Sequence, residues 1–237
     1  MLSSISALFS FIKKTPVSYT LPEGFTVTAH TGCEGVPDNS LESIKAGAAA
    51  GADIVEIDLH FLPDGTPVLK HDAPTASDAA SLPTLDSAFE LLSGLDVRMN
   101  VDVKSTANLG AVVELAEKHG VIDRIFFTGV NDGFVEAVKR DASSIPYYLN
   151  VDVKKNKNTD PAYLNSLVEK VKNCSAVGIN MNHKACSAEL VDAFRKAQLP
   201  VSVWTANSKA TMRRCLSFAP DNITTRKPSV LIGIMGR

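Results

Sequence analysis

The segment Ile54–Phe61 has the sequence IVEIDLHF, in which apolar and polar side chains alternate. A two-residue period is typical of a β-strand with one polar and one apolar face. Glu56, Asp58 and His60 share the polar face of this strand. We therefore expect a strand that packs its apolar face against helices and directs three polar side chains to the opposite side.

The segment Arg98–Lys104, with the sequence RMNVDVK, repeats this pattern further along the chain. Its polar face carries Asn100, Asp102 and Lys104, and its other face is apolar. In a closed barrel covered by helices, alternate strand residues point inward and functional groups collect at the carboxyl ends of the strands. The two segments together predict three carboxylates in one barrel interior.

Strand-like and helix-like segments alternate along the rest of the chain at a regular spacing. Strands are expected at Phe25–His30, Ile54–Phe61, Arg98–Lys104, Ile125–Val130, Pro146–Val153, Ala176–Asn182, Pro200–Thr205 and Asn222–Thr225. Helices are expected at Leu41–Ala50, Leu85–Leu92, Leu109–His119, Phe134–Arg140, Tyr163–Val171, Ala188–Ala197, Lys209–Phe218 and Pro228–Met235. The repeat is about 28 residues, which is close to a minimal (β/α)8 barrel. No G-x-G-x-x-G or phosphate-binding loop motif supports the rival fold, an open doubly wound sheet. The predicted fold class is α/β, a single-domain (β/α)8 TIM barrel with a short N-terminal helix.

The composition is that of an ordinary globular protein. The 237 residues carry a formal net charge of -2, with 45% hydrophobic and 21% charged residues. This composition excludes a disordered chain, and the lack of basic excess argues against a nucleic-acid partner. The four cysteines show no metal-like spacing, so we interpret them as reduced thiols rather than as a disulfide pair. We expect a cytoplasmic protein, and a secreted or membrane-surface protein is the alternative.

The first residues, Met1–Ile12, are apolar, but no basic residue precedes them and they are too few to cross a bilayer. Their apolar side chains recur at helical spacing. We expect residues 1–24 to form a helical segment packed on the barrel, residues 25–237 to form the barrel, and no stable membrane insertion. The sequence leaves the oligomeric state open.

Glu56, Asp58 and Asp102 would repel one another in a shared interior unless a cation lies between them. Three carboxylates with room for water suit Mg²⁺ or Ca²⁺. The alternative is an ion-pair network with Lys104 and Arg98. We favour the metal, because one lysine cannot offset three carboxylates.

Two histidines are candidates for acid and base catalysis. His30 ends the first strand, and His71 follows a predicted hairpin at the barrel rim. We expect structural roles for His119 and His183, whereas His60 lines the interior. Trp204 ends the seventh strand, where it either forms a wall for a cationic group of a ligand through cation–π contact or packs in the rim.

Several motifs around these residues resemble the glycerophosphodiester phosphodiesterase family. In chain order they are His30-Thr31-Gly32, Pro37-Asp38-Asn39-Ser40, Gly51-Ala52-Asp53-Ile54-Val55-Glu56-Ile57-Asp58, Asp64-Gly65-Thr66-Pro67-Val68, His71-Asp72, Asn100-Val101-Asp102-Val103-Lys104, Val203-Trp204-Thr205-Ala206-Asn207 and Ile223-Thr224-Thr225. The corresponding family pattern begins H-R-G, P-E-N-T, G-A-D-x-x-E-x-D, D-G-x-x-V and H-D.

The resemblance implies that His30 and His71 form the acid/base pair and that Glu56, Asp58 and Asp102 hold the metal. It implies contact of Lys104 with the phosphate, and hydrolysis of a small-molecule glycerophosphodiester, of the glycerophosphocholine or glycerophosphoethanolamine type. The products would be sn-glycerol 3-phosphate and an alcohol. The resemblance leaves open whether water attacks the phosphorus or the 2-hydroxyl of the glycerol does so, which would give a cyclic phosphate first.

The sequence departs from the family pattern at informative positions. Thr31 replaces the arginine after the first histidine, so it is expected at the substrate without the bidentate grip of a guanidinium. Arg226 replaces an aspartate in the closing T-D-x-P pattern, and Asp102 replaces a glutamate. Asn39 with Glu42 also fits a helix N-cap and its partner, a purely structural role.

Two alternatives to this activity remain at this point. The third strand also resembles the barrel of spider-toxin phospholipase D, a relative that acts on sphingomyelin or lysophospholipids. A barrel that binds a phosphorylated ligand without turnover is the non-enzymatic alternative.

Overall fold

Eight parallel strands form a closed barrel in the computed structural model, which describes residues 19–78 and 80–237. The barrel strands are β1 (Thr26–Ala29), β2 (Ile54–Phe61), β4 (Arg98–Val103), β5 (Ile125–Val130), β6 (Tyr147–Asn150), β7 (Gly178–Asn182), β8 (Val201–Trp204) and β9 (Asn222–Thr225). The barrel closes because β1 pairs with both β2 and β9. The predicted single-domain TIM barrel is confirmed.

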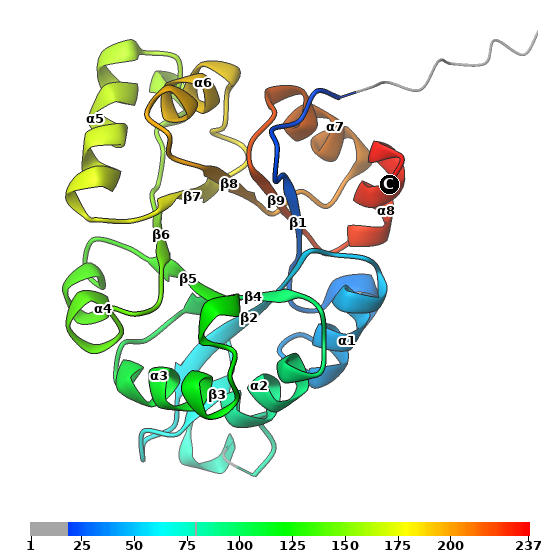
Figure 1. Cartoon of the computed structure of the whole chain (residues 1–237), viewed down its shortest axis with the longest axis vertical. Coiled ribbons are helices and arrows are strands. Elements are labelled where there is room, and N and C mark those ends of the chain that lie inside the picture. The colour runs from blue at the N-terminus through cyan, green and yellow to red at the C-terminus, as the bar shows by residue number, and fades with distance from the viewer. Residues whose placement is uncertain (1–18, 79) are drawn as a thin grey trace, which may run out of the picture.

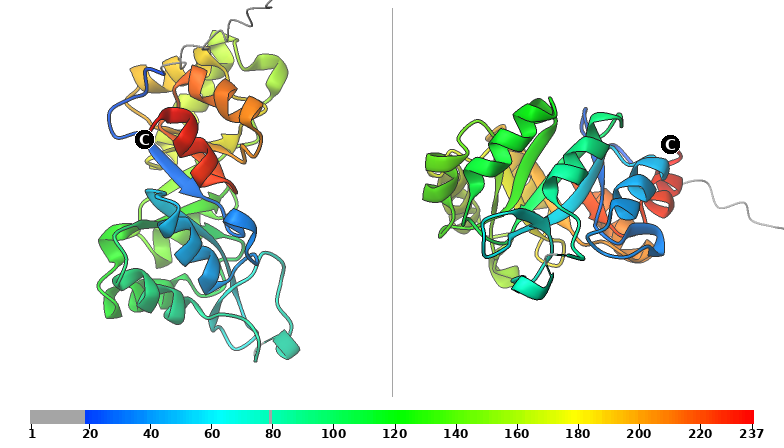
Figure 2. Two further views of the ribbon diagram at one scale, coloured as in Figure 1. Left: turned by 90° about the vertical axis from the view of Figure 1, so that its right-hand side faces the viewer. Right: turned by 90° about the horizontal axis from the view of Figure 1, so that it is seen from below.

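A helix follows each barrel strand and packs on the outside of the barrel (Figure 1). The helices are α1 (Leu41–Ala49), α2 (Leu85–Ser93), α3 (Leu109–Lys118), α4 (Val135–Asp141), α5 (Pro161–Asn173), α6 (Ala188–Lys196), α7 (Lys209–Phe218) and α8 (Pro228–Met235). The last helix, α8, packs against β1, so the two ends of the barrel sequence adjoin (Figure 2). The helix expected near the N-terminus falls largely on residues 1–18, outside the described residues.

A short antiparallel strand, β3 (Pro67–Leu69), pairs with the end of β2 and forms the predicted hairpin. This hairpin leads the chain to His71. His60 lies in its paired part, opposite Val68, and is not among the residues that line the barrel cavity. His60 shares a strand face with Glu56 and Asp58, but it lies beyond the residues that line the cavity.

The hydrophobic core lies between the barrel strands and the helices. Outward-facing residues of β2 and β4 are buried there, among them Ile57, Leu59 and Val101. The alternation in these strands thus separates an apolar outer layer from a polar interior, as the sequence predicts. Burial of the apolar layer stabilises the fold and leaves the interior of the barrel for polar groups.

Helix caps fix the loops at the carboxyl ends of the strands. Helix α1 begins after Ser40, whose hydroxyl accepts a hydrogen bond from the Ser43 N–H at 3.1 Å. The prediction that Asn39 caps this helix is wrong by one residue, since Asn39 has a φ of 53° and its side chain turns toward β2. Asn39 is therefore available to the site.

None of the helices in the described ranges is long and apolar enough to cross a membrane.

Candidate active site

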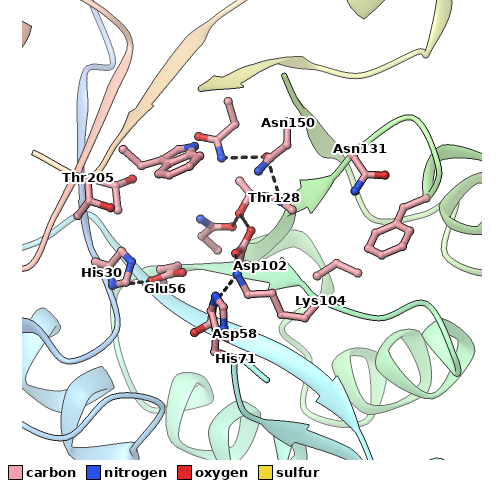
Figure 3. A pocket seen from close by; sticks show the side chains of 17 residues that line it. His30, Glu56, Asp58, His71, Asp102, Lys104, Thr128, Asn131, Asn150 and Thr205 are labelled. Atoms are coloured by element: carbon pink, nitrogen blue, oxygen red, sulfur yellow. Dashed lines mark hydrogen bonds and ion pairs between the residues drawn. The ribbon is translucent and has the colours of Figure 1, made fainter. Parts of the chain in front are cut away.

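A cavity of about 430 Å³ opens at the carboxyl ends of the barrel strands (Figure 3). Seven of the eight predicted site residues line it: His30, Glu56, Asp58, His71, Asp102, Lys104 and Trp204. They come from the ends of β1, β2, β4 and β8 and from the hairpin loop. The barrel topology thus brings together residues that are up to 174 positions apart in the sequence.

Three carboxylates lie close together on one wall of this cavity. Glu56, Asp58 and Asp102 each offer an oxygen that lies within 4.8 Å of the other two. The strand register explains this proximity, because Asp58 pairs directly with Asp102 in the β2–β4 ladder and Glu56 lies two residues before Asp58. Burial, followed by the charges of Asp58 and Asp102, raises the pKa of Glu56 well above its usual range.

Lys104 is the cation nearest to these acids. Its Nζ donates to Asp58 Oδ1 at 3.0 Å and to Asp102 Oδ2. Burial opposes the charge on Lys104, but attraction to Asp102 and Asp58 outweighs it and raises the lysine pKa. Arg98, the second residue of the expected network, lies instead at the far end of β4 and stacks over the Phe126 ring at 5.0 Å.

The donor set fits a divalent cation. With all three carboxylates ionised, one ammonium leaves two uncompensated negative charges, and oxygen ligands of this kind suit a hard ion. Glu56, Asp58 and Asp102 are thus the residues that could hold Mg²⁺ or Ca²⁺.

His30 lies beside the carboxylates at the end of β1. Its Nδ1 is 2.8 Å from the Thr31 carbonyl oxygen and 3.6 Å from Glu56 Oε2. A carbonyl only accepts, so this contact places the proton of a neutral imidazole on Nδ1 and the lone pair on Nε2. Burial, followed by the positive charge of Arg226, lowers the pKa of His30.

His71 lies at the mouth of the cavity with 67% of its side chain exposed. Its Nδ1 is 2.8 Å from Asp72 Oδ1, and this hydrogen bond lowers the pKa of Asp72. The two predicted catalytic histidines therefore differ in their surroundings. His30 is half-buried beside Glu56, whereas His71 is exposed beside Asp72. His119 and His183 do not line the cavity: His119 contacts Asp86 and His183 contacts Arg214.

Thr31 is the predicted site residue that does not reach the cavity. Its side chain is buried, and its hydroxyl accepts a hydrogen bond from the Asn39 N–H at 2.5 Å. Its own N–H donates to Glu56 Oε2 at 2.7 Å. Thr31 thus orients an acidic residue rather than facing the cavity.

The opposite wall of the cavity carries side chains to which the sequence analysis gave no role. They come from β5 to β9 and the loops that follow: Thr128, Asn131, Phe134, Asn150, Asn180, Thr205 and Thr224. The Asn180 side chain donates to Asn150 Oδ1 at 2.9 Å, and Thr128 donates to Asp102 Oδ1 at 2.8 Å. Polar residues at alternate positions near the ends of these strands were the signal that could have identified them.

A sequence model of the glycerophosphoryl diester phosphodiesterase family matches residues 30–96 and 73–230, which include the predicted motifs. The chain belongs to this family. It is accordingly an enzyme of the phosphoric diester hydrolase class.

Individual relatives agree with this assignment. A glycerophosphodiester phosphodiesterase of Caldanaerobacter subterraneus is 24% identical over 88% of this chain and 97% of that protein. An Oleispira antarctica phosphodiesterase, solved with the product sn-glycerol-3-phosphate, has a TM-score of 0.76 at 20% identity over 92% of this chain and 98% of its own. The glycerophosphodiester phosphodiesterase of Thermotoga maritima has a TM-score of 0.70 at 21% identity over 89% of this chain and 98% of its own. The two structures establish the shared fold.

Proposed function

We propose that this enzyme hydrolyses glycerophosphodiesters of the glycerophosphocholine and glycerophosphoethanolamine type, with Mg²⁺ or Ca²⁺ held by Glu56, Asp58 and Asp102. The reaction breaks the bond between phosphorus and the alcohol oxygen. Water supplies a hydroxyl group to phosphorus and a proton to the departing alcohol. The second product is sn-glycerol 3-phosphate. The product bound by the Oleispira antarctica relative supports this choice of substrate.

His30 is the proposed general base. Its Nδ1 is occupied by the Thr31 carbonyl oxygen, so Nε2 is the nitrogen left to accept a proton in the cavity. The Thr31 contact also fixes the imidazole ring next to Glu56. A fixed ring with one free nitrogen is suited to removing a proton from an attacking hydroxyl.

His71 is the proposed general acid. Asp72 accepts a hydrogen bond from its Nδ1 and orients the ring, so Nε2 is the position for the transferable proton. The exposure of His71 at the cavity mouth matches an alcohol that departs toward solvent.

A divalent ion, when bound to the three carboxylates, supplies positive charge that polarises the phosphoryl group. Lys104 contributes a second positive charge beside it and faces the same cavity. The buried indole N–H of Trp204 has no hydrogen-bond partner among the described residues, so we propose that it donates to the substrate.

The observation that carries the proposal is the acid triad with His30 beside it and His71 at the mouth of the same cavity. Release of glycerol 3-phosphate from glycerophosphocholine and glycerophosphoethanolamine should be measured with Mg²⁺ and with Ca²⁺. Activity should disappear with EDTA and return when either metal is added back.

Two further substrates separate the alternatives. If the enzyme turns over lysophosphatidylcholine or sphingomyelin but no glycerophosphodiester, a phospholipase D-like activity replaces the proposal. Binding of glycerol 3-phosphate without turnover of any diester would favour a non-catalytic barrel. We propose the cytoplasm as the compartment, which the four free cysteines support.

A further inference from the structure

Two departures from the family motifs lie next to each other in space. Thr31 and Arg226 follow the ends of β1 and β9, which are neighbouring strands with Ala29 paired to Thr225. The His30 N–H donates to the Thr225 carbonyl oxygen at 2.9 Å, so the two ends are joined where the departures occur. The family pattern has an arginine at position 31 and an aspartate at position 226, whereas this chain has Thr31 and Arg226.

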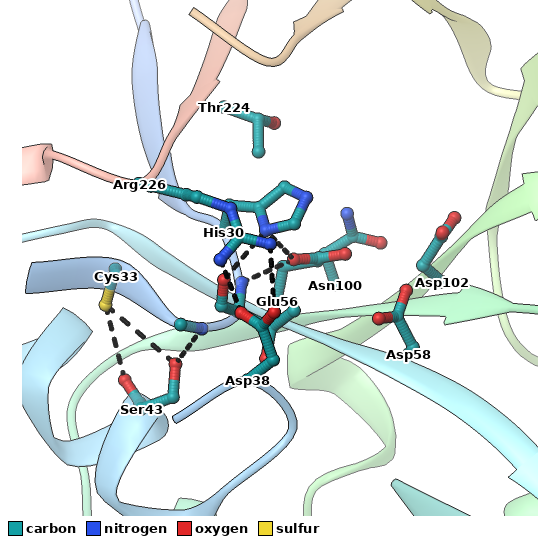
Figure 4. A network of polar contacts seen from close by, with 12 residues as sticks. His30, Cys33, Asp38, Ser43, Glu56, Asp58, Asn100, Asp102, Thr224 and Arg226 are labelled. Atoms are coloured by element: carbon teal, nitrogen blue, oxygen red, sulfur yellow. Dashed lines mark hydrogen bonds and ion pairs between the residues drawn. The ribbon is translucent and has the colours of Figure 1, made fainter. Parts of the chain in front are cut away.

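Arg226 forms an ion pair with Asp38, which lies 188 residues earlier in the chain (Figure 4). Both terminal nitrogens of the guanidinium take part: Nη1 donates to Asp38 Oδ1, and Nη2 donates to Asp38 Oδ2 at 3.3 Å. The Arg226 backbone is also held, because its N–H donates to Asn207 Oδ1 at 2.8 Å and its carbonyl oxygen accepts from the Glu34 N–H at 2.9 Å. The pair thus connects β9 firmly to the loop before α1.

This ion pair packs directly on the turn that follows His30. A Cβ atom added to Gly32 would overlap Asp38 Oδ1 and lie 2.5 Å from Arg226 Nη1. The φ of Gly32 is 70°, a conformation that also favours glycine. Gly32 therefore provides the space in which Arg226 and Asp38 meet beside His30.

The residue after Asp38 connects the ion pair to the acid triad. The Asn39 side chain donates to Asp58 Oδ2 at 2.9 Å and accepts from the Asp58 N–H at 2.9 Å. Asn39 has a φ of 53°, a conformation that costs free energy for a residue with a side chain unless its surroundings hold it. The Thr31 hydroxyl holds the Asn39 N–H, and the ion pair with Arg226 holds the preceding residue, Asp38.

We propose that Arg226 is a positioning residue, which through Asp38 and Asn39 fixes Asp58 for its role in the site. This inference rests on the proposed function for the role of Asp58. The side chains of Arg226 and Asp38 are 37% and 53% exposed. Exposed ion pairs of this kind contribute little to global stability, so the effect of the pair is on local geometry.

The test combines single substitutions with an exchange of the two charges. Purified Arg226→Ala, Asp38→Ala and the exchanged double variant Asp38→Arg/Arg226→Asp are titrated with Ca²⁺ and with Mn²⁺ by calorimetry. kcat and KM for glycerophosphocholine and the melting temperature are measured on the same samples. Arg237→Ala is the matched control, because Arg237 forms a similar exposed ion pair with Asp53 at the opposite end of β2.

We expect each single substitution to weaken metal affinity about five-fold or more and to lower kcat about ten-fold, with KM and the melting temperature nearly unchanged. The exchanged double variant should recover most of both losses, which would show that the effect comes from the ion pair rather than from either side chain alone. The unchanged melting temperature separates this effect from a loss of global stability. Arg237→Ala should match the wild type in metal affinity and kcat.

Two results would overturn the positioning role. One is wild-type metal affinity and kcat in Arg226→Ala. The other is a rise in KM alone in Arg226→Ala, without rescue by the exchange, which would place the guanidinium on the substrate itself. If the wild type turns over no diester, the proposed function fails, whereas the metal titrations still decide whether Arg226 positions Asp58.

Discussion

His30 and His71 occupy different surroundings, and their different contacts allow their roles to be separated by substitution. We expect His30→Ala and His71→Ala each to lower kcat by roughly 10² to 10⁴ while leaving metal binding intact. A diester with a p-nitrophenol leaving group needs no protonation of the departing oxygen. On that substrate His71→Ala should recover most of its rate, and His30→Ala should not.

The rates of both variants on the natural and the activated substrate check this assignment. His119→Ala is a suitable control, since His119 contacts Asp86 away from the cavity. Equal recovery of both variants on the p-nitrophenyl substrate would remove the separate acid and base roles. Unchanged rates in both would remove the histidines from the mechanism.

At the scale of one element, β5 carries an irregularity next to the acid triad. Its register with β6 shifts between Phe127 and Val130, and Gly129 lies within the shift with a φ of 75°. The Gly129 N–H donates to Asn150 Oδ1 at 3.0 Å, and a Cβ added there would lie 2.7 Å from Asp102 Oδ1. The irregularity brings the backbone of β5 close to a proposed metal ligand.

Gly129→Ala should therefore affect both stability and metal binding. We expect a loss of about 2 kcal/mol in the free energy of unfolding, because of the positive φ and the contact with β4. The displaced Asp102 should also weaken Ca²⁺ binding. Denaturant unfolding and calorimetric titration measure the two effects.

Gly233→Ala is the control for this substitution. Gly233 lies within α8, and an added Cβ would meet nothing within 4 Å. Alanine there should increase the free energy of unfolding by about 0.5–1 kcal/mol and leave metal binding unchanged. A Gly129→Ala variant that behaves like Gly233→Ala would show that β5 does not constrain the site.

The strands and helices were predictable because each combines a clear period with local end signals. In β2 and β4 the alternation fixes which residues face the interior, and the structure places Glu56, Asp58 and Asp102 there. The N-cap of α1 was misassigned because Asn39 and Ser40 are both good capping residues. Only the contact of Asn39 with Asp58, 19 residues away, decides between them.

The contact between Arg226 and Asp38 lay beyond the reach of sequence reasoning for a different reason. The two positions lie 188 apart in the sequence, which leaves no local signal of their pairing. Thr31 shows the same limit, since its substitution suggested a gap at the substrate, whereas its hydroxyl is engaged by the Asn39 backbone. Tertiary contacts, rather than local periodicity, determine these details.

At the scale of the whole molecule, the acid triad couples metal binding to stability. An ion that binds only the folded barrel stabilises it by about 2.7 kcal/mol at 100 times its dissociation constant. For a chain of this length we expect the melting temperature to rise by about 5–10 °C. The rise should appear with Ca²⁺ or Mg²⁺ and be reversed by EDTA.

Asp102→Asn provides the matched test of this coupling. The substitution keeps the size of the side chain but removes one of the three charges, so most of the metal-dependent rise should disappear. Asp132→Asn, at an exposed ion pair with Lys170, should retain the full rise. A melting temperature that is insensitive to metal in the wild type would argue that the carboxylates hold no ion.

The pairing of β1 with β9 also has a consequence for biosynthesis. The strands that carry His30 and the three acids are all made before residue 105, yet the barrel closes only when residues 222–225 pair with residues 26–29. While the ribosome is still adding β5 to β9, the nascent chain holds a row of carboxylates with no barrel around them. Competence for metal binding should therefore arise only after β9 has been made and has paired with β1.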